Sequence, residues 1–416
     1  MRTDRYKEQP KKKKSRTALK VLLVLILLLL VAIPASVYYI YRSTENSLAI
    51  TFKEKNAKYE IGENIASATL IASSEGDVKA SEKELDTDTI GEKEVKYTVS
   101  KSLFGGLLKP RKRFFLRYTV EDSTPPVMLW SGDGAVVVKG EKFDIKKVIG
   151  YGDNADPTPK VEYKGKVDTN NNGDYPIHVT VTDASGNSID WDTTITVADS
   201  FPSYTDDSPR TEYSDFIKTY KKDGSHFGID VSDWQRDIDF EEVASAGCEF
   251  VIIRAGYSDE GKVTIDEKFK QNYERAKKAG LKIGLYLYSY DNTEEKARAS
   301  AKWIIEQLGG DTLDLPVAFD WEDFGQFQNY EMSFITLNRL YDAFAEELSS
   351  AGYDCMLYGS KNYLEKIWAD TDKRPVWLAH YTDQTDYQGS YRIWQASCTG
   401  HINGIDGDVD MDILYD

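Results

Sequence analysis

The stretch VAFDWEDFG, residues 317–325, places Asp320 and Glu322 one residue apart at the end of a short apolar run. Side chains two positions apart on a β-strand point to the same face, and at about 3.3 Å per residue they are separated by ~7 Å along the strand. Charged groups at the end of a buried strand are costly unless they are solvated or used. Paired carboxylates within reach of one sugar linkage can hydrolyse a glycosidic bond.

Other apolar runs contribute further polar side chains of the same parity. Asp230 belongs to the first run of the C-terminal region and Asp410 to the last, which gives four candidate catalytic acids with Asp320 and Glu322. Clustered carboxylates push one another's pKa values apart, so that one stays protonated while others ionise. Aromatic walls suit sugar rings, and the candidate substrate-binding residues on these strands are Arg254, Tyr286, Tyr288, Trp377 and Tyr381. Solvated strand ends or helix caps are the alternative interpretation, but acids on strands one, four and eight favour catalysis.

The elements that must position these residues begin at His226, where apolar runs alternate with helical patterns. Phe269, Tyr273 and Ala276 recur at helical spacing, and Gly280 ends that predicted helix. Eight strands in ~190 residues, with helices mainly in the first five gaps, predict an irregular β/α (TIM-like) barrel; an open doubly wound sheet is the alternative. The eight predicted strands lie in 226–232, 250–257, 282–290, 316–322, 354–360, 375–381, 392–397 and 408–415.

Seven short motifs in this region occur in the order seen in one enzyme family. They are GIDVSDWQ, FVIIRAGY, GLYLYSY, FDWE, VWLAHY, IWQ and GDVDMD. Together they resemble the family 25 glycoside hydrolases, the Chalaropsis-type lysozymes, over about 190 residues. RAGYSDEG departs from the Lys-x-Ser/Thr-Glu-Gly segment that is common in that family after the second strand, so one side of the cleft is expected to differ from that form.

The resemblance implies a barrel-like fold that hydrolyses the β-1,4 bond between N-acetylmuramic acid and N-acetylglucosamine, without metal or cofactor. Its Asp-x-Glu pair falls on Asp320 and Glu322, and its first- and last-strand acids fall on Asp230 and Asp410. It also places wall aromatics at Tyr286, Trp377, Tyr381 and Trp394, and the IWQ motif adds Gln395 to the candidate binding residues. Whether the mechanism retains or inverts the anomeric configuration stays open.

The middle of the chain contains a repeat. LDTDTIGEKEVKYTV begins at Leu85 and VDTNNNGDYPIHVTV at Val167, and in each a Gly precedes alternating apolar residues. Two immunoglobulin-like β-sandwiches are predicted, at 44–123 and 124–199, followed by a polar linker at 200–222 and the catalytic barrel at 223–416. The sandwiches are interpreted as a spacer, with wall or partner binding as the alternative. Residues 102–118 mix basic and apolar side chains and could contact anionic wall polymer or lipid headgroups, although a solvated basic hairpin is the more common case.

The N-terminus is organised like a membrane anchor. Residues 21–41 carry no charge and span ~32 Å as a helix. Six basic residues at 11–20 precede them and predict a cytoplasmic tail at 1–20, with the chain beyond Arg42 outside. A cleaved signal peptide is the less favoured alternative, because its apolar core is normally shorter.

The charge and cysteine content of the chain limit the classes of partner and ligand that it is expected to bind. Beyond residue 42 the chain holds 42 basic and 67 acidic residues, which argues against nucleic acid as a partner. The three cysteines have no metal-site spacing. We therefore expect a membrane-anchored, extracellular peptidoglycan muramidase that remodels the cell wall, without cofactor or metal and with unknown protein partners. A glycan-binding or scaffold protein without activity is the alternative.

Overall fold

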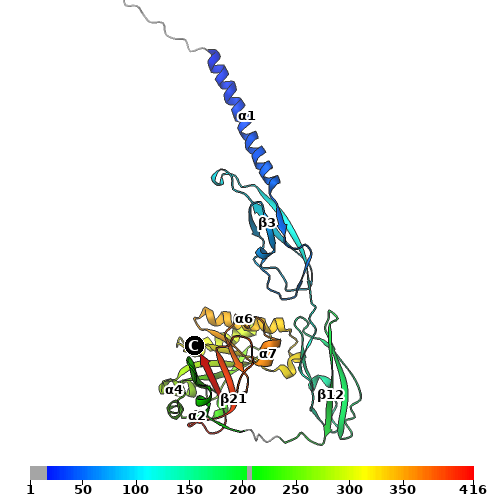
Figure 1. Cartoon of the computed structure of the whole chain (residues 1–416), viewed down its shortest axis with the longest axis vertical. Helices are drawn as coiled ribbons and strands as arrows, with labels where there is room; N and C mark the ends of the chain where they lie inside the picture. The colour runs from blue at the N-terminus through cyan, green and yellow to red at the C-terminus, as the bar shows by residue number, and fades with distance from the viewer. Residues whose placement is uncertain (1–15, 204–208) are drawn as a thin grey trace, which may run out of the picture. The chain divides into compact units, whose positions relative to one another are not determined.

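The computed structural model describes residues 16–203 and 209–416, which form two compact units that divide after Asp122. The first unit begins with the helix α1 (Arg16–Ser47), which contains an 18-residue window with a mean hydropathy of 2.9 that is not buried. Its length and composition would allow it to cross a membrane (Figure 1). The first 15 residues of the predicted cytoplasmic tail lie outside the described residues.

The rest of the first unit is a small β-module. A four-stranded sheet has the order β2-β6-β5-β4, and a two-stranded sheet pairs β1 with β3. The predicted alternation at Val95, Tyr97 and Val99 is confirmed, because all three side chains are buried. The strands are β1 (Ile50–Phe52), β2 (Ala57–Glu60), β3 (Ile71–Ser74), β4 (Asp77–Ala80), β5 (Gly91–Ser100) and β6 (Arg111–Glu121), with short 3₁₀ turns η1 (Ser67–Leu70) and η2 (Phe104–Gly106).

The second unit opens with a β-module of the same plan. Its four-stranded sheet has the order β10-β11-β12-β8, and β7 pairs with β9. The repeated motif lies in β5 of the first module and β11 of the second, each paired antiparallel to the next long strand. The strands are β7 (Val127–Trp130), β8 (Val136–Val138), β9 (Gly150–Gly152), β10 (Lys160–Lys164), β11 (Gly173–Thr182) and β12 (Ser188–Ala198), with η3 (Ile145–Lys147) between β8 and β9.

The C-terminal domain contains a closed, barrel-like sheet. Its strands are β14 (Ser225–Val231), β15 (Phe250–Asp259), β17 (Lys282–Ser289), β18 (Val317–Asp320), β19 (Cys355–Ser360), β20 (Val376–Ala379), β21 (Ile393–His401) and β22 (Val409–Tyr415). The first seven pair in parallel in this order, and β22 pairs antiparallel with both β14 and β21. Only seven residues join β21 to β22, too few for a parallel crossover. The sheet therefore differs from the expected TIM-like plan in its last strand.

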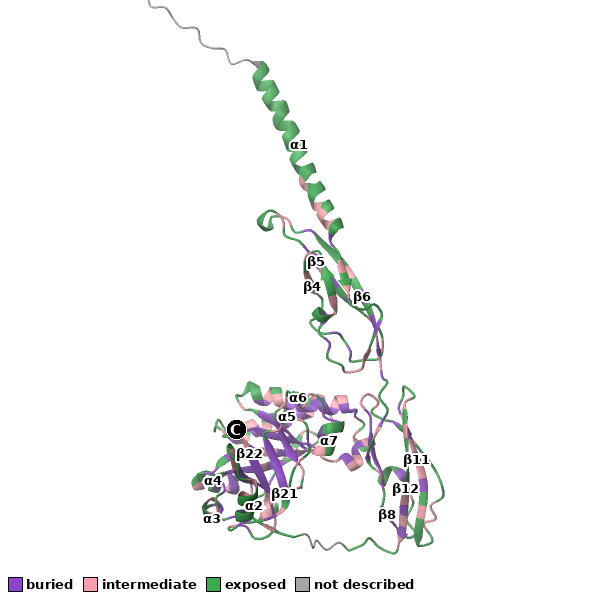
Figure 2. Ribbon diagram, viewed as in Figure 1, coloured by how far each residue is buried: buried purple, intermediate pink, exposed green. Residues whose placement is uncertain are grey.

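Helices cover the outside of this sheet (Figures 1 and 2). They are α3 (Phe240–Ser245), α4 (Phe269–Ala279), α5 (Glu294–Leu308), α6 (Phe334–Ser350) and α7 (Lys361–Lys366). The predicted stop at Gly280 is confirmed, since this residue ends α4 in the left-handed conformation. Val317 and Phe319 pack in the outer core with the helices, and Ala318 packs in the inner cluster. The two faces of β18 therefore divide as its period-two pattern predicts.

Two local elements differ from the expectations. Residues 211–220 of the predicted linker form β13 (Thr211–Glu212) and α2 (Tyr213–Tyr220), and the buried Tyr213 and Phe216 join the outer core. The C-terminal domain therefore begins before residue 223. The RAGYSDEG segment extends β15 into a hairpin with β16 (Lys262–Ile265), a strand that is not among the eight predicted from the sequence.

Within the second unit, the β-module contacts the 3₁₀ segment η5 (Phe324–Tyr330), which follows the predicted acids. The side-chain Nε2 of Gln328 donates to the backbone carbonyl oxygens of Lys146 at 2.7 Å and Ile149 at 3.2 Å. A Cβ atom at Gly152 would lie 2.7 Å from ring carbons of Phe327 and Phe334. This module therefore supports the loop beside the predicted acids, a role that the spacer interpretation does not include.

Candidate active site

Asp320 and Glu322 lie at the carboxyl end of β18, as their position in the sequence predicts. β18 ends at Asp320, so Glu322 projects from the following loop. Asp320 is 4% exposed and lies in register with Tyr288 of β17. Its Oδ1 atom is buried without a hydrogen-bond partner among the described residues. A buried carboxyl oxygen that its own fold leaves unsatisfied is available to a substrate donor.

Asp230 and Asp410 are direct neighbours across the closing strand pair. Asp230 of β14 is in register with Asp410 of β22. The side-chain amide of Gln395 on β21 donates to Asp230 Oδ2 at 2.8 Å. The structure thus brings the first- and last-strand acids together and adds Gln395 as their partner.

Asp412 is a further acid of the cluster, beyond the four predicted from the sequence. It is fully buried, and the indole nitrogen of Trp377 donates to its Oδ1 at 2.8 Å. Burial raises the pKa of Asp412 to about 8. The motif DVDMD could have predicted this residue, because Asp412 lies two positions after Asp410 and therefore points to the same face of the strand.

Burial controls the protonation of the whole cluster. It raises the pKa of Glu322 to about 7 and that of Asp410 to about 9, the latter with help from the Asp230 charge. Burial and the neighbouring carboxylates also raise the pKa values of Asp230 and Asp320 well above their usual range, while the guanidinium of Arg254 acts in the opposite direction on Asp320. Buried carboxyls this close cannot all ionise together. A protonated acid beside an ionisable one is therefore expected near neutral pH.

Arg254 is held by two other acids. Its Nε donates to Asp266 Oδ2 at 2.8 Å, and its terminal nitrogen pairs with Asp233. This pairing fixes the guanidinium near the cluster. It also means that Arg254 already has partners, so a contact with substrate would have to share them.

Two tyrosines are linked to the acid cluster by hydrogen bonds to Gln395, which itself binds Asp230. Tyr381, 54% exposed, and Tyr358 of β19 both donate their hydroxyls to Gln395 Oε1 at 2.9 Å. Tyr358 was not selected from the sequence, although it lies in the predicted fifth strand. Tyr286 contacts the edge of Trp377, with ring centroids 6.0 Å apart.

Three aromatic side chains differ in how they relate to this cluster. Tyr288 lies beside Tyr290, with centroids 5.1 Å apart, and next to Asp320 in register. Trp394 is not brought to the acids: it lies in the outer core, where its ring contacts Tyr220. Trp234 was not selected from the sequence, yet it follows β14 and is 80% exposed, as a sugar-stacking platform would be.

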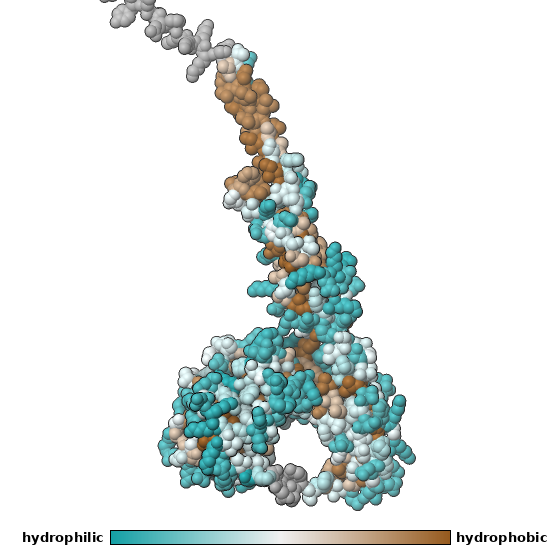
Figure 3. Space-filling model, in the orientation of Figure 1, coloured by the Kyte–Doolittle hydropathy of each residue, from teal (hydrophilic) through white to brown (hydrophobic). Residues whose placement is uncertain are grey.

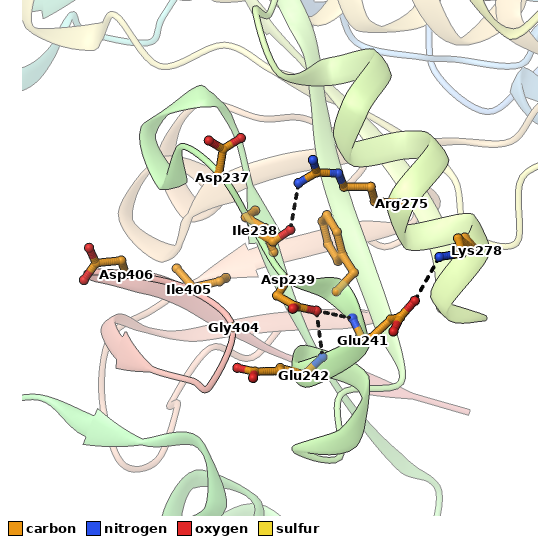
Figure 4. A pocket seen from close by; sticks show the side chains of 11 residues that line it. Asp237, Ile238, Asp239, Glu241, Glu242, Arg275, Lys278, Gly404, Ile405 and Asp406 are labelled. Atoms are coloured by element: carbon orange, nitrogen blue, oxygen red, sulfur yellow. Dashed lines mark hydrogen bonds and ion pairs between the residues drawn. The ribbon is translucent and has the colours of Figure 1, made fainter.

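A separate hollow of about 720 Å³ lies between α3, α4 and the loop before β22, and it contains none of the predicted site residues (Figure 4). Two of its acids have structural partners. Asp239 caps α3 by accepting from the backbone of Glu241 and Glu242, and Glu241 accepts from Lys278 at 3.0 Å. We therefore place the site at the carboxyl ends of the parallel strands instead.

Comparison with known proteins identifies the families to which two parts of the chain are similar. The model of glycosyl hydrolases family 25 matches residues 229–405, and that of the Ig-like domain of bacterial surface proteins matches residues 130–197. The chain is 33% identical over 196 residues to the Autolytic lysozyme of Clostridium acetobutylicum, which covers 44% of this chain and 54% of that protein. It is 30% identical over 196 residues to Lysozyme M1 of Streptomyces globisporus, covering 44% and 65% respectively.

The chain thus spans between about half and two thirds of the length of these two relatives. A crystal structure of the bacterial lysozyme from Streptomyces coelicolor is 26% identical and covers 46% of this chain and 92% of its own, with a TM-score of 0.40. Residues 130–197 form an Ig-like domain of the bacterial surface type, and residues 229–405 form a glycosyl hydrolase family 25 domain.

Proposed function

We propose that this protein is a membrane-anchored muramidase that hydrolyses the β-1,4 bond between N-acetylmuramic acid and N-acetylglucosamine in peptidoglycan. The observation that carries the proposal is Glu322, whose pKa burial raises to about 7, next to the buried Asp320 at the end of β18. A carboxyl group that keeps its proton near neutral pH can act as a general acid. The family assignment and the lysozymes among its relatives support the same substrate class.

In the proposed mechanism, Glu322 donates its proton to the glycosidic oxygen as the bond breaks. Asp320 orients and stabilises the 2-acetamido group of the substrate, which attacks the anomeric carbon. Asp230 and Asp410 set the charge around the bond, and Gln395 holds Asp230 in place through its 2.8 Å hydrogen bond. Inversion, in which one aspartate activates water, is the alternative route.

The proposed location is the outer face of the cell membrane. The basic residues before α1 favour a cytoplasmic N-terminus, which puts the β-modules and the C-terminal domain on the wall side. Such an anchored hydrolase would remodel nearby wall. Resistance of the full chain to alkaline extraction from membranes, with external protease removing the C-terminal domain, is the expected result; release as a soluble chain would contradict the anchor.

The activity is tested with full-length protein, its Glu322→Gln variant and a matched Asp323→Asn variant on purified peptidoglycan. Asp323, next in the chain, accepts a hydrogen bond from Tyr330 at 2.6 Å instead of belonging to the acid cluster. We expect new reducing ends and muramic-acid-terminated products from the wild type and from Asp323→Asn, and a loss of at least 10³-fold in Glu322→Gln. Near-normal hydrolysis by Glu322→Gln would refute the role of this residue. Glycan binding without cleavage by the wild type would make the chain a binding protein.

A further inference from the structure

The hairpin that joins β5 to β6 carries an unusual concentration of positive charge. Residues 101–117 contain six lysines and arginines and no acid, in a chain whose net charge is −17. Arg117 pairs with Glu94 at 3.5 Å on the neighbouring strand, and Lys112 donates to the carbonyl oxygen of Leu48 at 3.3 Å. The hairpin as a whole therefore presents an excess of positive charge.

The same hairpin exposes large apolar side chains at its tip. Leu107 is 85% exposed and Phe104 is 59% exposed. The tip turns through η2, where Phe104, Gly105 and Gly106 all have positive φ angles. In Figure 3 a hydrophobic lobe projects from the module beside the end of α1. Exposed apolar groups that are surrounded by basic residues are typical of surfaces that bind membranes.

The base of the hairpin lies against the end of α1. A pocket of about 610 Å³ is lined by Tyr41, Arg42, Glu45 and Asn46 of α1 and by Thr98, Arg111, Lys112 and Arg113 of the sheet. Tyr41 is the last residue of the uncharged run 21–41. If α1 spans the membrane, the pocket therefore lies at the depth of the lipid headgroups. Among the lining residues, Arg42 pairs with Glu45, the one acid. The other three cations, Arg111, Lys112 and Arg113, give the pocket a net positive charge.

We propose that this hairpin surface, residues 101–117, binds the outer leaflet of the membrane that holds α1. Arg111, Lys112 and Arg113 bind the phosphate groups of anionic phospholipids, while Phe104 and Leu107 enter the boundary between headgroups and acyl chains. The proposal rests on the membrane anchor that we propose above. It assigns the first β-module a function beyond spacing, which is to attach the base of the protein to the membrane surface.

An anionic wall polymer would also attract the positive charge, but two observations favour lipid. A polyanion offers no apolar surface against which Leu107 and Phe104 could be buried, whereas a membrane interface buries such side chains. The pocket is also built partly from α1 itself, at the end of its apolar run. The five steps from Lys112 to Leu107 can extend over at most ~17 Å. Lys112 contacts Leu48, which directly follows the last residue of α1, and Tyr41 lies ~9 Å from that last residue, Ser47, along the helix. The tip can therefore reach the interface.

The test places an environment-sensitive NBD label on the full chain in lipid nanodiscs. Leu107→Cys is labelled in a Cys398→Ser background, because the other two cysteines are buried. A label at the exposed Lys164→Cys of the second β-module is the matched control. Nanodiscs contain either phosphatidylcholine alone or 40% phosphatidylglycerol, and nitroxide lipids report the depth of the label. A variant with Arg111→Glu and Arg113→Glu tests the role of charge.

With phosphatidylglycerol we expect blue-shifted emission and nitroxide quenching at position 107 and not at position 164. The two charge reversals should lower the equilibrium constant for membrane contact of the hairpin more than ~25-fold, at ~5-fold for each basic residue near an anionic surface. Equal solvent exposure of the label in both lipids, or an unchanged signal in the reversed variant, overturns the proposal. A response only to added poly(glycerol phosphate) overturns it in favour of wall polymer. Failure of the chain to incorporate into nanodiscs overturns the anchor and this proposal together, whereas hydrolytic activity is unaffected by either result.

Discussion

A substitution at Asp412 tests whether the buried carboxylate cluster lowers the free energy of unfolding of the domain. The side chain is fully buried, and its Oδ1 accepts from the Trp377 indole at 2.8 Å. Asp412→Asn keeps an acceptor for that indole and removes the ionisable group. We expect the variant to be more stable than the wild type at neutral pH, and we expect the gain to depend on pH.

The magnitude follows from the difference between the folded and unfolded pKa values of this residue. Burial raises the folded pKa of Asp412 to about 8, whereas an unfolded aspartate titrates near 3.9. The stability contributed by a group with a raised pKa is fully present below pH ~4 and is lost as pH rises towards 8. At 1.36 kcal/mol per pH unit, the loss at pH 7 is about 4 kcal/mol. Weakened contacts of the new amide reduce the net gain, so we expect about 2–4 kcal/mol.

Urea unfolding of both proteins from pH 4 to pH 8, followed by tryptophan fluorescence, measures this difference. The change in unfolding free energy from Asp412→Asn should be about −2 to 0 kcal/mol at pH 4, where only the weakened amide contacts act, and should rise by up to ~1.4 kcal/mol per pH unit towards pH 7. Asp383→Asn, which changes an exposed carboxylate of the same domain, is the control and should show no such slope. A variant that is destabilised equally at every pH would refute the reasoning, because the carboxyl would then act only through its hydrogen bonds.

Three further predictions concern catalysis and the contact of the β-module. Activity should fall as pH rises through about 7, because Glu322 loses the proton it donates; a kcat profile that stays flat to pH 9 would contradict this. Gln395→Ala should lower kcat/KM by ~10- to 100-fold, because it leaves the buried Asp230 without the 2.8 Å hydrogen bond that positions it. Circular dichroism should be unchanged, and an unaltered kcat/KM would remove Gln395 from the site. Gly152→Ala should destabilise the second unit by ~1–3 kcal/mol through overpacking, whereas Gly325→Ala, with open space around its Cβ, should not; thermal unfolding that is equal for the two variants would exclude tight packing there.

Much of the C-terminal domain could be predicted because local rules determine it. The eight apolar runs became strands, and the two faces of β18 divide by parity, with Ala318 inside and Phe319 outside. Capping residues also act locally, so Thr293 begins α5 by accepting from the backbone of Lys296, and Gly309 ends that helix. Such patterns depend on near neighbours in the chain and are visible in one sequence.

Features that depend on tertiary contacts could not be predicted in this way. Tyr213 and Phe216 occur in a polar segment that resembled a linker, and only the core of the domain gives them a place to pack. Trp394 is an aromatic residue of the kind that lines sugar-binding clefts. On its strand, however, the side chain points into the outer core, where it contacts Tyr220. The contact of Gln328 with the β-module joins residues about 180 positions apart, which periodicity cannot reveal.

The direction of the last strand explains why Asp410 belongs with Asp230. In an all-parallel barrel the site receives residues from the carboxyl ends of the strands, and β22 would then contribute residues near Tyr415. Because β22 runs antiparallel, its first residues lie at the mouth instead, and Asp410 falls in register with Asp230. Asp412 then lies two residues deeper on the same face, where burial raises its pKa. The acid cluster of this domain therefore depends on its departure from the regular barrel, and the short connection between β21 and β22 is what imposes that departure.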